Sequence, residues 1–161
     1  MPDTKLKSTK ATTALREDHK KVKHLFSEYE KLGEKGKPEA KQKLFDEMNL
    51  ELTVHATIEE EIFYPAIEAL KDEDEEAGDI VNEAEEEHKI VKTLLAELSE
   101  LDPEAEEFDA KVTVLIENVR HHAEEEEKEM FPFFEELPQE RQDEISEKMR
   151  LRKNELMQAE E

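Results

Sequence analysis

The sequence predicts an all-α protein, an up-down-up-down four-helix bundle with an additional C-terminal helix. Apolar residues recur at helical spacing through five stretches of the chain, and no window shows the alternation of a β-strand. Most of the 3 glycines and 6 prolines fall between these stretches. Long helices joined by short connections pack antiparallel to their neighbours in the chain, which is the arrangement of a bundle.

Breaker residues mark where each helix is expected to end. The first helix ends at the segment 33–38, which contains two glycines and a proline, and the second fades in the charged run 71–76. Pro103 stops the third helix, because the residue before a proline is pushed out of the α region. Pro138 ends the fourth helix and suits the first turn of the fifth.

These boundaries divide the chain into three parts: a flexible N-terminus (1–11), the bundle (12–137) and the C-terminal helix (138–161). The C-terminal part has a thin apolar stripe and a density of basic residues that is unusual in this chain. We therefore expect it to pack at the periphery of the acidic bundle or on a partner.

The amino-acid composition restricts the kinds of partner that the protein can bind. Among 161 residues, 46 Asp and Glu oppose 23 Lys and Arg, which gives a formal net charge of −23. Such a charge can signal disorder, but Glu favours helices and the acidic runs lie mostly off the apolar stripes, so narrow-striped amphipathic helices are the better interpretation. The charge also repels phosphate backbones and anionic lipids, so we expect neither a nucleic-acid nor a membrane partner.

Several classes of site and location can be set aside. The chain has no cysteine, which excludes disulfides, iron–sulfur clusters and thiolate zinc sites. No phosphate-binding loop or serine nucleophile elbow is present. No apolar run is long enough for a membrane span, and the first residues are too polar for a signal peptide, so a cytoplasmic protein is expected. We also expect a monomer or weak homodimer.

An internal repeat organises the histidines. Residues 17–25 align with 86–94 at an offset of 69, and residues 55–65 align with 122–132 at an offset of 67. Each copy is a helical hairpin with one histidine on its first helix. The second helix of each copy carries His-x-x-x-Glu followed by an aromatic residue and proline.

Four histidines share the apolar faces of these helices: His19, His55, His88 and His122. Glu59 and Glu126 each lie one helical turn after a histidine, on the same face. One buried histidine is most often a hydrogen-bonded core residue, but four with two glutamates would leave buried charges poorly paired. A pair of divalent metal ions resolves this, and the ligand types suit iron or manganese and can also take zinc.

The remaining histidines and the aromatic-proline pairs are assigned other roles. His24 and His121 lie on polar faces, which indicates solvated surface. The pairs at 64–65 and 131–132 are interpreted as packing and kink residues rather than ligands, with each proline freeing a carbonyl one turn back.

Residues 12–137 resemble the hemerythrin-like HHE cation-binding domains, whose second and fourth helices carry His-x-x-x-Glu followed by the aromatic-proline pair. The resemblance implies a non-heme di-iron centre with two oxo- or hydroxo-bridged iron ions. It places His19 and His55 on one iron and His88 and His122 on the other, with Glu59 and Glu126 bridging them.

The chain departs from the oxygen carriers of that family at one position. Their fifth histidine, four residues before the one matched by His88, is replaced by Ala84. This leaves one iron short of a nitrogen ligand and more open to water, hydrogen peroxide or nitric oxide, which argues against reversible oxygen carriage. Glu85 and solvent are the candidates to fill the gap. A catalase-like or nitric oxide-reactive protein is expected, with an oxygen carrier or an oxygen or iron sensor without turnover as the alternative.

Overall fold

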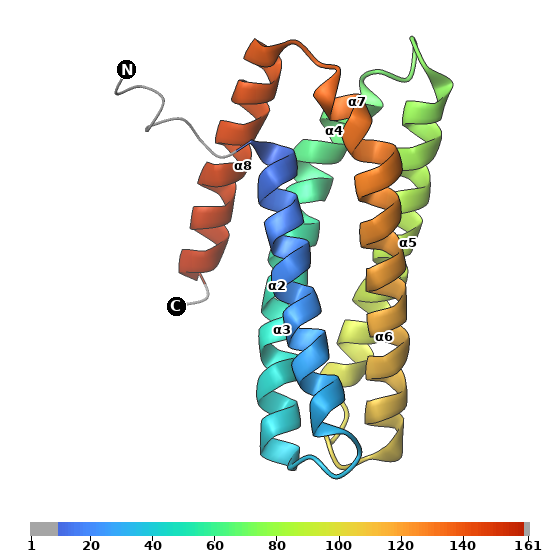
Figure 1. The fold of residues 1–161 in the computed structure, drawn as a ribbon, viewed down its shortest axis with the longest axis vertical. Helices are drawn as coiled ribbons and strands as arrows, with labels where there is room; N and C mark the ends of the chain where they lie inside the picture. Colours follow the sequence, from blue (N-terminus) through green and yellow to red (C-terminus); the bar gives the residue numbers. More distant parts are fainter. Residues whose placement is uncertain (1–9, 160–161) are drawn as a thin grey trace.

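A computed structural model describes residues 10–159, and this part of the chain is helical with no strand. The four long helices are α2 (Ala11–Leu32), α3 (Pro38–Ile58), α5 (Glu75–Ser99) and α6 (Glu106–Glu125). They run side by side, and α8 (Gln139–Ala159) lies outside them (Figure 1). The predicted all-α four-helix bundle with an additional C-terminal helix is confirmed.

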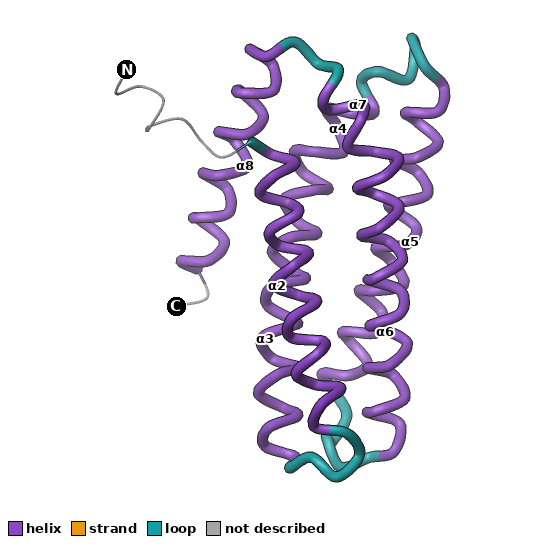
Figure 2. The backbone as a smooth tube through the Cα atoms, viewed as in Figure 1, coloured by secondary structure: helices purple, strands orange, loops and turns teal. Residues whose placement is uncertain are grey.

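The bundle is made of two helical hairpins, as the internal repeat predicted. Helix α2 packs along α3, and α5 packs along α6. Fewer contacts join α3 to α5 and α2 to α6 across the hairpins. The loops lie at the two ends of the bundle (Figure 2), which leaves the middle of all four helices free to carry a site.

Local sequence explains the ends of the helices. Gly33, which follows α2, has φ of 61°, a conformation that glycine adopts at little cost. Pro38 occupies the first position of α3, where its missing N–H has no helical partner to lose. The Asp74 side chain caps α5 by accepting a hydrogen bond from the Glu76 backbone N–H at 3.0 Å.

Both second helices contain a π-helical turn beside their proline. Turn η1 (Glu59–Phe63) joins α3 to the short α4 (Tyr64–Glu68). Turn η2 (Glu126–Met130) joins α6 to α7 (Phe131–Glu135) in the same way. The second residue of each short helix is proline, which lacks an N–H and crowds the carbonyl four residues earlier. The wider π turn accommodates this clash and the missing helical hydrogen bond. The kinks expected at the aromatic-proline pairs therefore take the form of π turns.

Apolar residues form two buried clusters along the bundle. One, near the loops 33–37 and 100–105, includes Phe26, Phe45 and Phe108. The other, near α4 and α7, includes Phe63 and Phe134. Along the helices, the four buried histidines lie between the two clusters. The layer that these histidines form therefore has apolar side chains on both sides.

Helix α8 packs on α2, α3 and η1. Its buried residues Ile145 and Met149 belong to the same apolar cluster as α4 and α7. The Ser146 hydroxyl accepts a hydrogen bond from the backbone N–H of Ala11 at 2.8 Å. Ala11 is buried and begins α2, whereas residues 1–9 of the N-terminus predicted to be flexible lie outside the described residues.

Candidate metal centre

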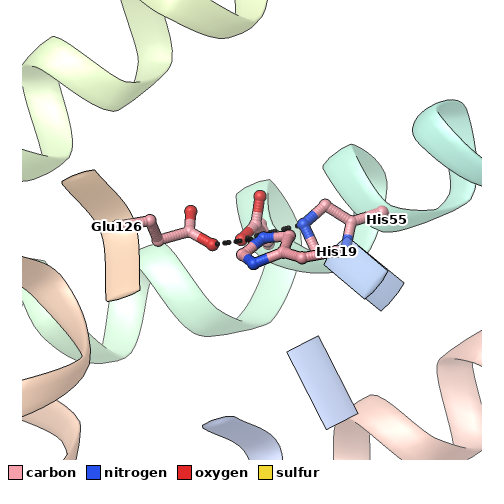
Figure 3. Close-up of side chains that lie close together, drawn as sticks. His19, His55 and Glu126 are labelled. Carbon is pink, nitrogen blue, oxygen red and sulfur yellow. Dashed lines mark ion pairs between the residues drawn. The ribbon is translucent and has the colours of Figure 1, made fainter. Parts of the chain in front are cut away.

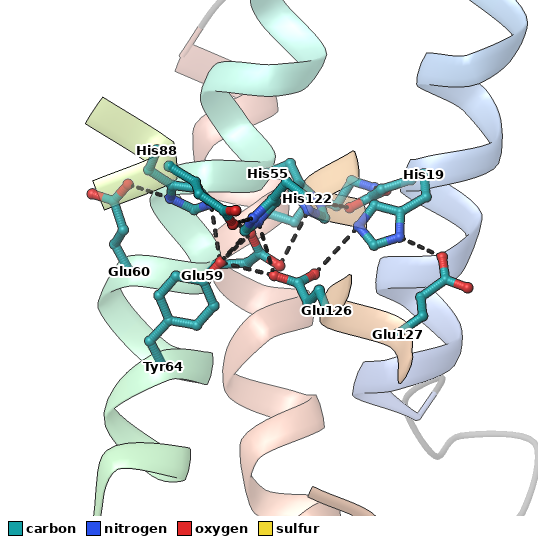
Figure 4. A network of polar contacts seen from close by, with 12 residues as sticks. His19, His55, Glu59, Glu60, Tyr64, His88, His122, Glu126 and Glu127 are labelled. Carbon is teal, nitrogen blue, oxygen red and sulfur yellow. Dashed lines mark hydrogen bonds and ion pairs between the residues drawn. The ribbon is translucent and has the colours of Figure 1, made fainter. Parts of the chain in front are cut away.

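The six predicted ligands meet in one layer of the bundle (Figure 4). Each long helix supplies one histidine, and each π turn begins with one of the two glutamates. All six residues are buried, and Glu59 and Glu126 are 0% and 2% exposed. Because both glutamates start a π turn, the backbone distortion caused by the prolines falls at the residues that face the centre of the bundle.

The first cluster consists of His19, His55, Glu59 and Glu126. The His19 Nε2 atom is 3.3 Å from Glu126 Oε1 (Figure 3), and His55 Nε2 is 3.2 Å from Glu59 Oε2. None of these four atoms has a hydrogen-bond partner within the described part of the chain. Buried polar atoms are almost always paired, so four orphaned ligand atoms at one point fit a metal cation.

The second cluster consists of His88, His122 and the same two glutamates. The His88 Nε2 atom is 3.1 Å from Glu59 Oε1, and His122 Nε2 is 3.2 Å from Glu126 Oε2. Each glutamate therefore offers one oxygen to the first cluster and the other oxygen to the second. This is the arrangement that two bridging carboxylates require.

Tyr64 adds a group that the sequence interpretation missed. Its hydroxyl donates a hydrogen bond to Glu126 Oε2 at 2.8 Å and lies 3.2 Å from Glu59 Oε1. The same oxygen is 3.0 Å from His88 Nε2 and 3.2 Å from His122 Nε2. Tyr64 is thus more than a packing residue, because its hydroxyl touches all four ligand atoms of the second cluster.

Neither residue considered at the position of the missing fifth histidine belongs to the buried clusters. Ala84 is buried at 4% exposure, whereas Glu85 is exposed and belongs to neither buried cluster. Glu85 therefore does not fill the gap. The oxygen that approaches the second cluster is the Tyr64 hydroxyl, which comes from the opposite hairpin.

Each of the four histidines also has a carboxylate on its outer nitrogen. The Nδ1 contacts are His19 to Glu127 at 2.7 Å, His55 to Asp18 at 2.9 Å, His88 to Glu60 at 2.7 Å and His122 to Glu87 at 2.6 Å. We call Glu127, Asp18, Glu60 and Glu87 the outer carboxylates. Such partners orient a ligating imidazole and leave its other nitrogen free for a metal.

The outer carboxylates occupy matching positions in the two copies of the internal repeat. Asp18 and Glu87 each precede a histidine by one residue, at the offset of 69, and Glu60 and Glu127 each follow a bridging glutamate, at the offset of 67. The signal that could have identified them was therefore present in the aligned copies.

Charge in the layer favours a bound cation. Burial opposes protonation of His122, but the hydrogen bonds that its ring donates to Glu126 and Glu87 outweigh this effect and raise its pKa to about 10. Burial also opposes protonation of His55. Glu59 and Asp18 outweigh this effect, so the pKa of His55 lies well above its usual value. The carboxylates thus favour positive charge in this layer, and a bound metal ion would supply it.

The other two histidines lie where the sequence predicted. The side chains of His24 and His121 are 71% and 66% exposed. His24 faces Glu28, and His121 forms a small surface group with Glu87 and Glu125. Neither belongs to the buried layer.

A cavity of about 180 Å³ adjoins the four buried histidines. All four long helices contribute apolar residues to its walls: Val22, Leu52, Val91, Leu95 and Val119. The surface that faces the cavity is almost entirely apolar. Such a space suits small, uncharged molecules better than ions or large organic ligands.

Comparisons with known proteins agree with this geometry. The hemerythrin HHE cation binding domain family matches residues 10–134. The chain is 34% identical over 117 residues to a DNA nickase of Nostoc sp. strain PCC 7120, covering 73% of this chain and 31% of that protein. It is 33% identical over 94 residues to the uncharacterized protein Rv2633c of Mycobacterium tuberculosis strain H37Rv, covering 58% of this chain and 54% of that protein.

A solved structure extends the similarity to the fold. The HHE cation binding domain-containing Rv2633c homolog from Mycobacterium kansasii superposes with a TM-score of 0.77 at 25% identity, covering 94% of this chain and 89% of that one. The chain spans about a third of the Nostoc relative and about half of the tuberculosis relative. No helix in residues 10–159 is long and apolar enough to cross a membrane.

Proposed function

Since the chain belongs to the hemerythrin HHE cation-binding family, we propose that it is a non-heme di-iron protein that binds or reacts with a small oxidant at its two buried clusters. The oxidant is hydrogen peroxide, nitric oxide or dioxygen. The proposal does not extend to nucleic acids or membranes, because a formal charge of −23 repels both.

The observation that carries the proposal is the division of the glutamate oxygens. One oxygen of Glu59 and one of Glu126 meet two imidazole nitrogens as orphaned buried atoms, and the other two oxygens meet the second pair of imidazoles around Tyr64. Imidazole and carboxylate ligands in a bundle core suit iron, with manganese or zinc as substitutes.

The chain's own residues define the tasks of the site. His19 and His55 would hold one ion and His88 and His122 the other, while both glutamates hold the two together. The outer carboxylates fix the imidazole rings, and the Tyr64 hydroxyl stands beside the second ion as a further oxygen ligand or proton donor. Bound iron would supply open coordination positions and electrons for the oxidant.

Turnover of peroxide tests the reactive form of the proposal. Iron-loaded protein should evolve oxygen from hydrogen peroxide, and His122→Ala should abolish this activity. His121→Ala is the matched control, because the adjacent histidine is exposed and should be dispensable. Rates equal to those of free iron, or equal losses in the two variants, would contradict catalysis at this site.

The apolar cavity favours a second candidate, reversible binding of a diatomic gas without turnover. The surface that its walls expose is almost entirely apolar, whereas peroxide chemistry needs protons to be moved. A stable absorption spectrum of the ferrous protein under dioxygen, reversed on deoxygenation, would support an oxygen carrier or sensor. Irreversible oxidation on the first exposure would exclude it.

A further inference from the structure

Helix α8 lies outside the segment 10–134 that the family matches, yet it reaches the metal layer. Lys153 Nζ donates to Asp18 Oδ1 at 2.8 Å. The other oxygen of Asp18 is 2.9 Å from Nδ1 of His55. A continuous chain of charged hydrogen bonds therefore runs from the C-terminal helix to one of the predicted ligands.

We propose that Lys153 is a positioning residue for the metal centre, which holds Asp18 so that Asp18 orients His55 toward the first metal ion. The inference rests on the proposed function, since it assigns a role at the same centre. It places α8 among the elements that complete the site, where the sequence had indicated a helix that serves only the periphery.

The geometry around Asp18 shows why both partners are needed. Asp18 is 8% exposed, so water cannot freely replace a lost partner. One oxygen is taken by Lys153 and the other by His55, so the carboxylate plane is fixed from both sides. With the ring oriented in this way, His55 Nε2 lies 3.2 Å from Glu59 Oε2, inside the first cluster.

The other outer carboxylates show that a cation partner recurs at this layer. Glu60, which contacts His88, receives Lys92 at 2.6 Å. Glu127, which contacts His19, has Arg16 at 3.9 Å. Both of those cations come from the long helices, whereas the cation of Asp18 comes from α8. The cation that pairs with Asp18 is therefore supplied by an additional helix, whereas the bundle itself supplies the cations that lie near Glu60 and Glu127.

The docking of α8 fixes where Lys153 lies. Ile145 and Met149 are 1% and 5% exposed and pack in the apolar cluster. Arg152 pairs with Glu61 through two contacts of 2.7 and 3.2 Å, and Ser146 accepts the N–H of Ala11. The lysine is therefore held by a packed helix, and its half-exposed side chain is aimed at Asp18.

Release of iron to a ferrous chelator tests the proposal without relying on activity. Lys153→Met retains most of the aliphatic stem and removes the charge. We expect one of the two iron equivalents to leave about threefold to tenfold faster, which is less than the ~10–100-fold cost of losing an outer partner itself, because Lys153 acts through Asp18. Lys153→Arg should restore the wild-type rate, and Lys148→Met, which removes an exposed lysine of the same helix, should not change it.

Two further variants separate positioning from mere docking. In an Asp18→Asn background, Lys153→Met should add nothing, because both changes break the same chain of hydrogen bonds. Ser146→Ala removes one docking contact of α8 without changing Lys153 or Asp18, and should accelerate release less than Lys153→Met does. Equal acceleration by Ser146→Ala, or a wild-type rate in Lys153→Met, would overturn the role of Lys153 alone. Failure of the wild-type protein to hold iron would overturn the proposed function as well.

Discussion

The two halves of the molecule repeat one hairpin, but they treat their metal positions differently. Phe131 stacks on His19 with ring centroids 6.2 Å apart and planes inclined by 8°, and its counterpart Tyr64 lies against His88 at 5.2 Å. Only the tyrosine carries a hydroxyl, which enters the second cluster. The first cluster therefore has four orphaned atoms, and the second is already bridged by a phenol.

The outer carboxylates differ as well. Asp18 receives Lys153 from α8, whereas its counterpart Glu87 lies with His121 and Glu125 on the surface. In the first half, the positions that match His121 and Glu125 are the apolar residues 54 and 58, which belong to the buried cluster shared with α8. Duplication thus explains the common layer of histidines and glutamates, and a single added helix together with one hydroxyl makes the two clusters unequal.

The largest effect should come from the residues that both halves share. Glu59→Ala or Glu126→Ala removes an oxygen from each ion at once, so metal affinity should fall by more than the ~10–100-fold typical of an outer partner. Elemental analysis after desalting should find most of the metal lost. The surface change His24→Ala should leave the content unchanged, and equal losses in both would refute the ligand assignment.

Metal removal should loosen the junction between the halves. Glu59 and Glu126 come from opposite hairpins and each would bind both ions, so bound ions should stabilise the association of the hairpins. At metal concentrations ~100-fold above Kd, linkage adds about 2.7 kcal/mol per site. Thermal melting with and without a chelator measures this. Identical melting temperatures would count against a buried centre.

Exchanging the two aromatic residues tests the asymmetry itself. Tyr64→Phe removes the extra oxygen from the second cluster, and we expect about tenfold weaker binding of one ion while the other is unaffected. Phe131→Tyr places a hydroxyl at the matching position of the first cluster. Chelator titration resolves the two ions, and an equal effect of Tyr64→Phe on both would show that the halves are equivalent.

A smaller effect concerns protons. The pKa of His122 is raised to about 10 in the metal-free protein from an ordinary value of 6.5, so its protonation stabilises that form fully below pH 6.5 and progressively less as the pH rises toward about 10. Metal must displace this proton. Uptake at pH 7 to 8 should therefore release protons, and affinity should rise with pH. Calorimetry in buffers of different ionisation enthalpy measures the release, and its absence would contradict the ligation of His122.

The fold and the ligand layer could be predicted because their signals are local. Helical spacing places His55 and Glu59 on one face whatever the rest of the chain does, and the repeat multiplies that signal. The role of Tyr64 depends on a π turn, which spacing alone does not reveal. Of the two candidates for the gap beside Ala84, Glu85 is exposed, because one residue along a helix rotates the side chain by about 100°, away from the layer that Ala84 faces.

The contact of Lys153 could not be predicted for a different reason. The basic residues of the C-terminal segment were visible, but which of them meets Asp18 depends on how α8 packs across the bundle, and 135 residues separate the pair. Sequence patterns fix the faces of a helix more firmly than its register against a distant one.

The metal content of freshly purified protein tests the central claim most directly. Elemental analysis, combined with spectroscopy of the iron, should find two iron ions per chain in the wild type and in His121→Ala, and far fewer in His122→Ala. A protein that is isolated without metal and fails to take up ferrous iron would contradict the account, as would retention of both ions by His122→Ala.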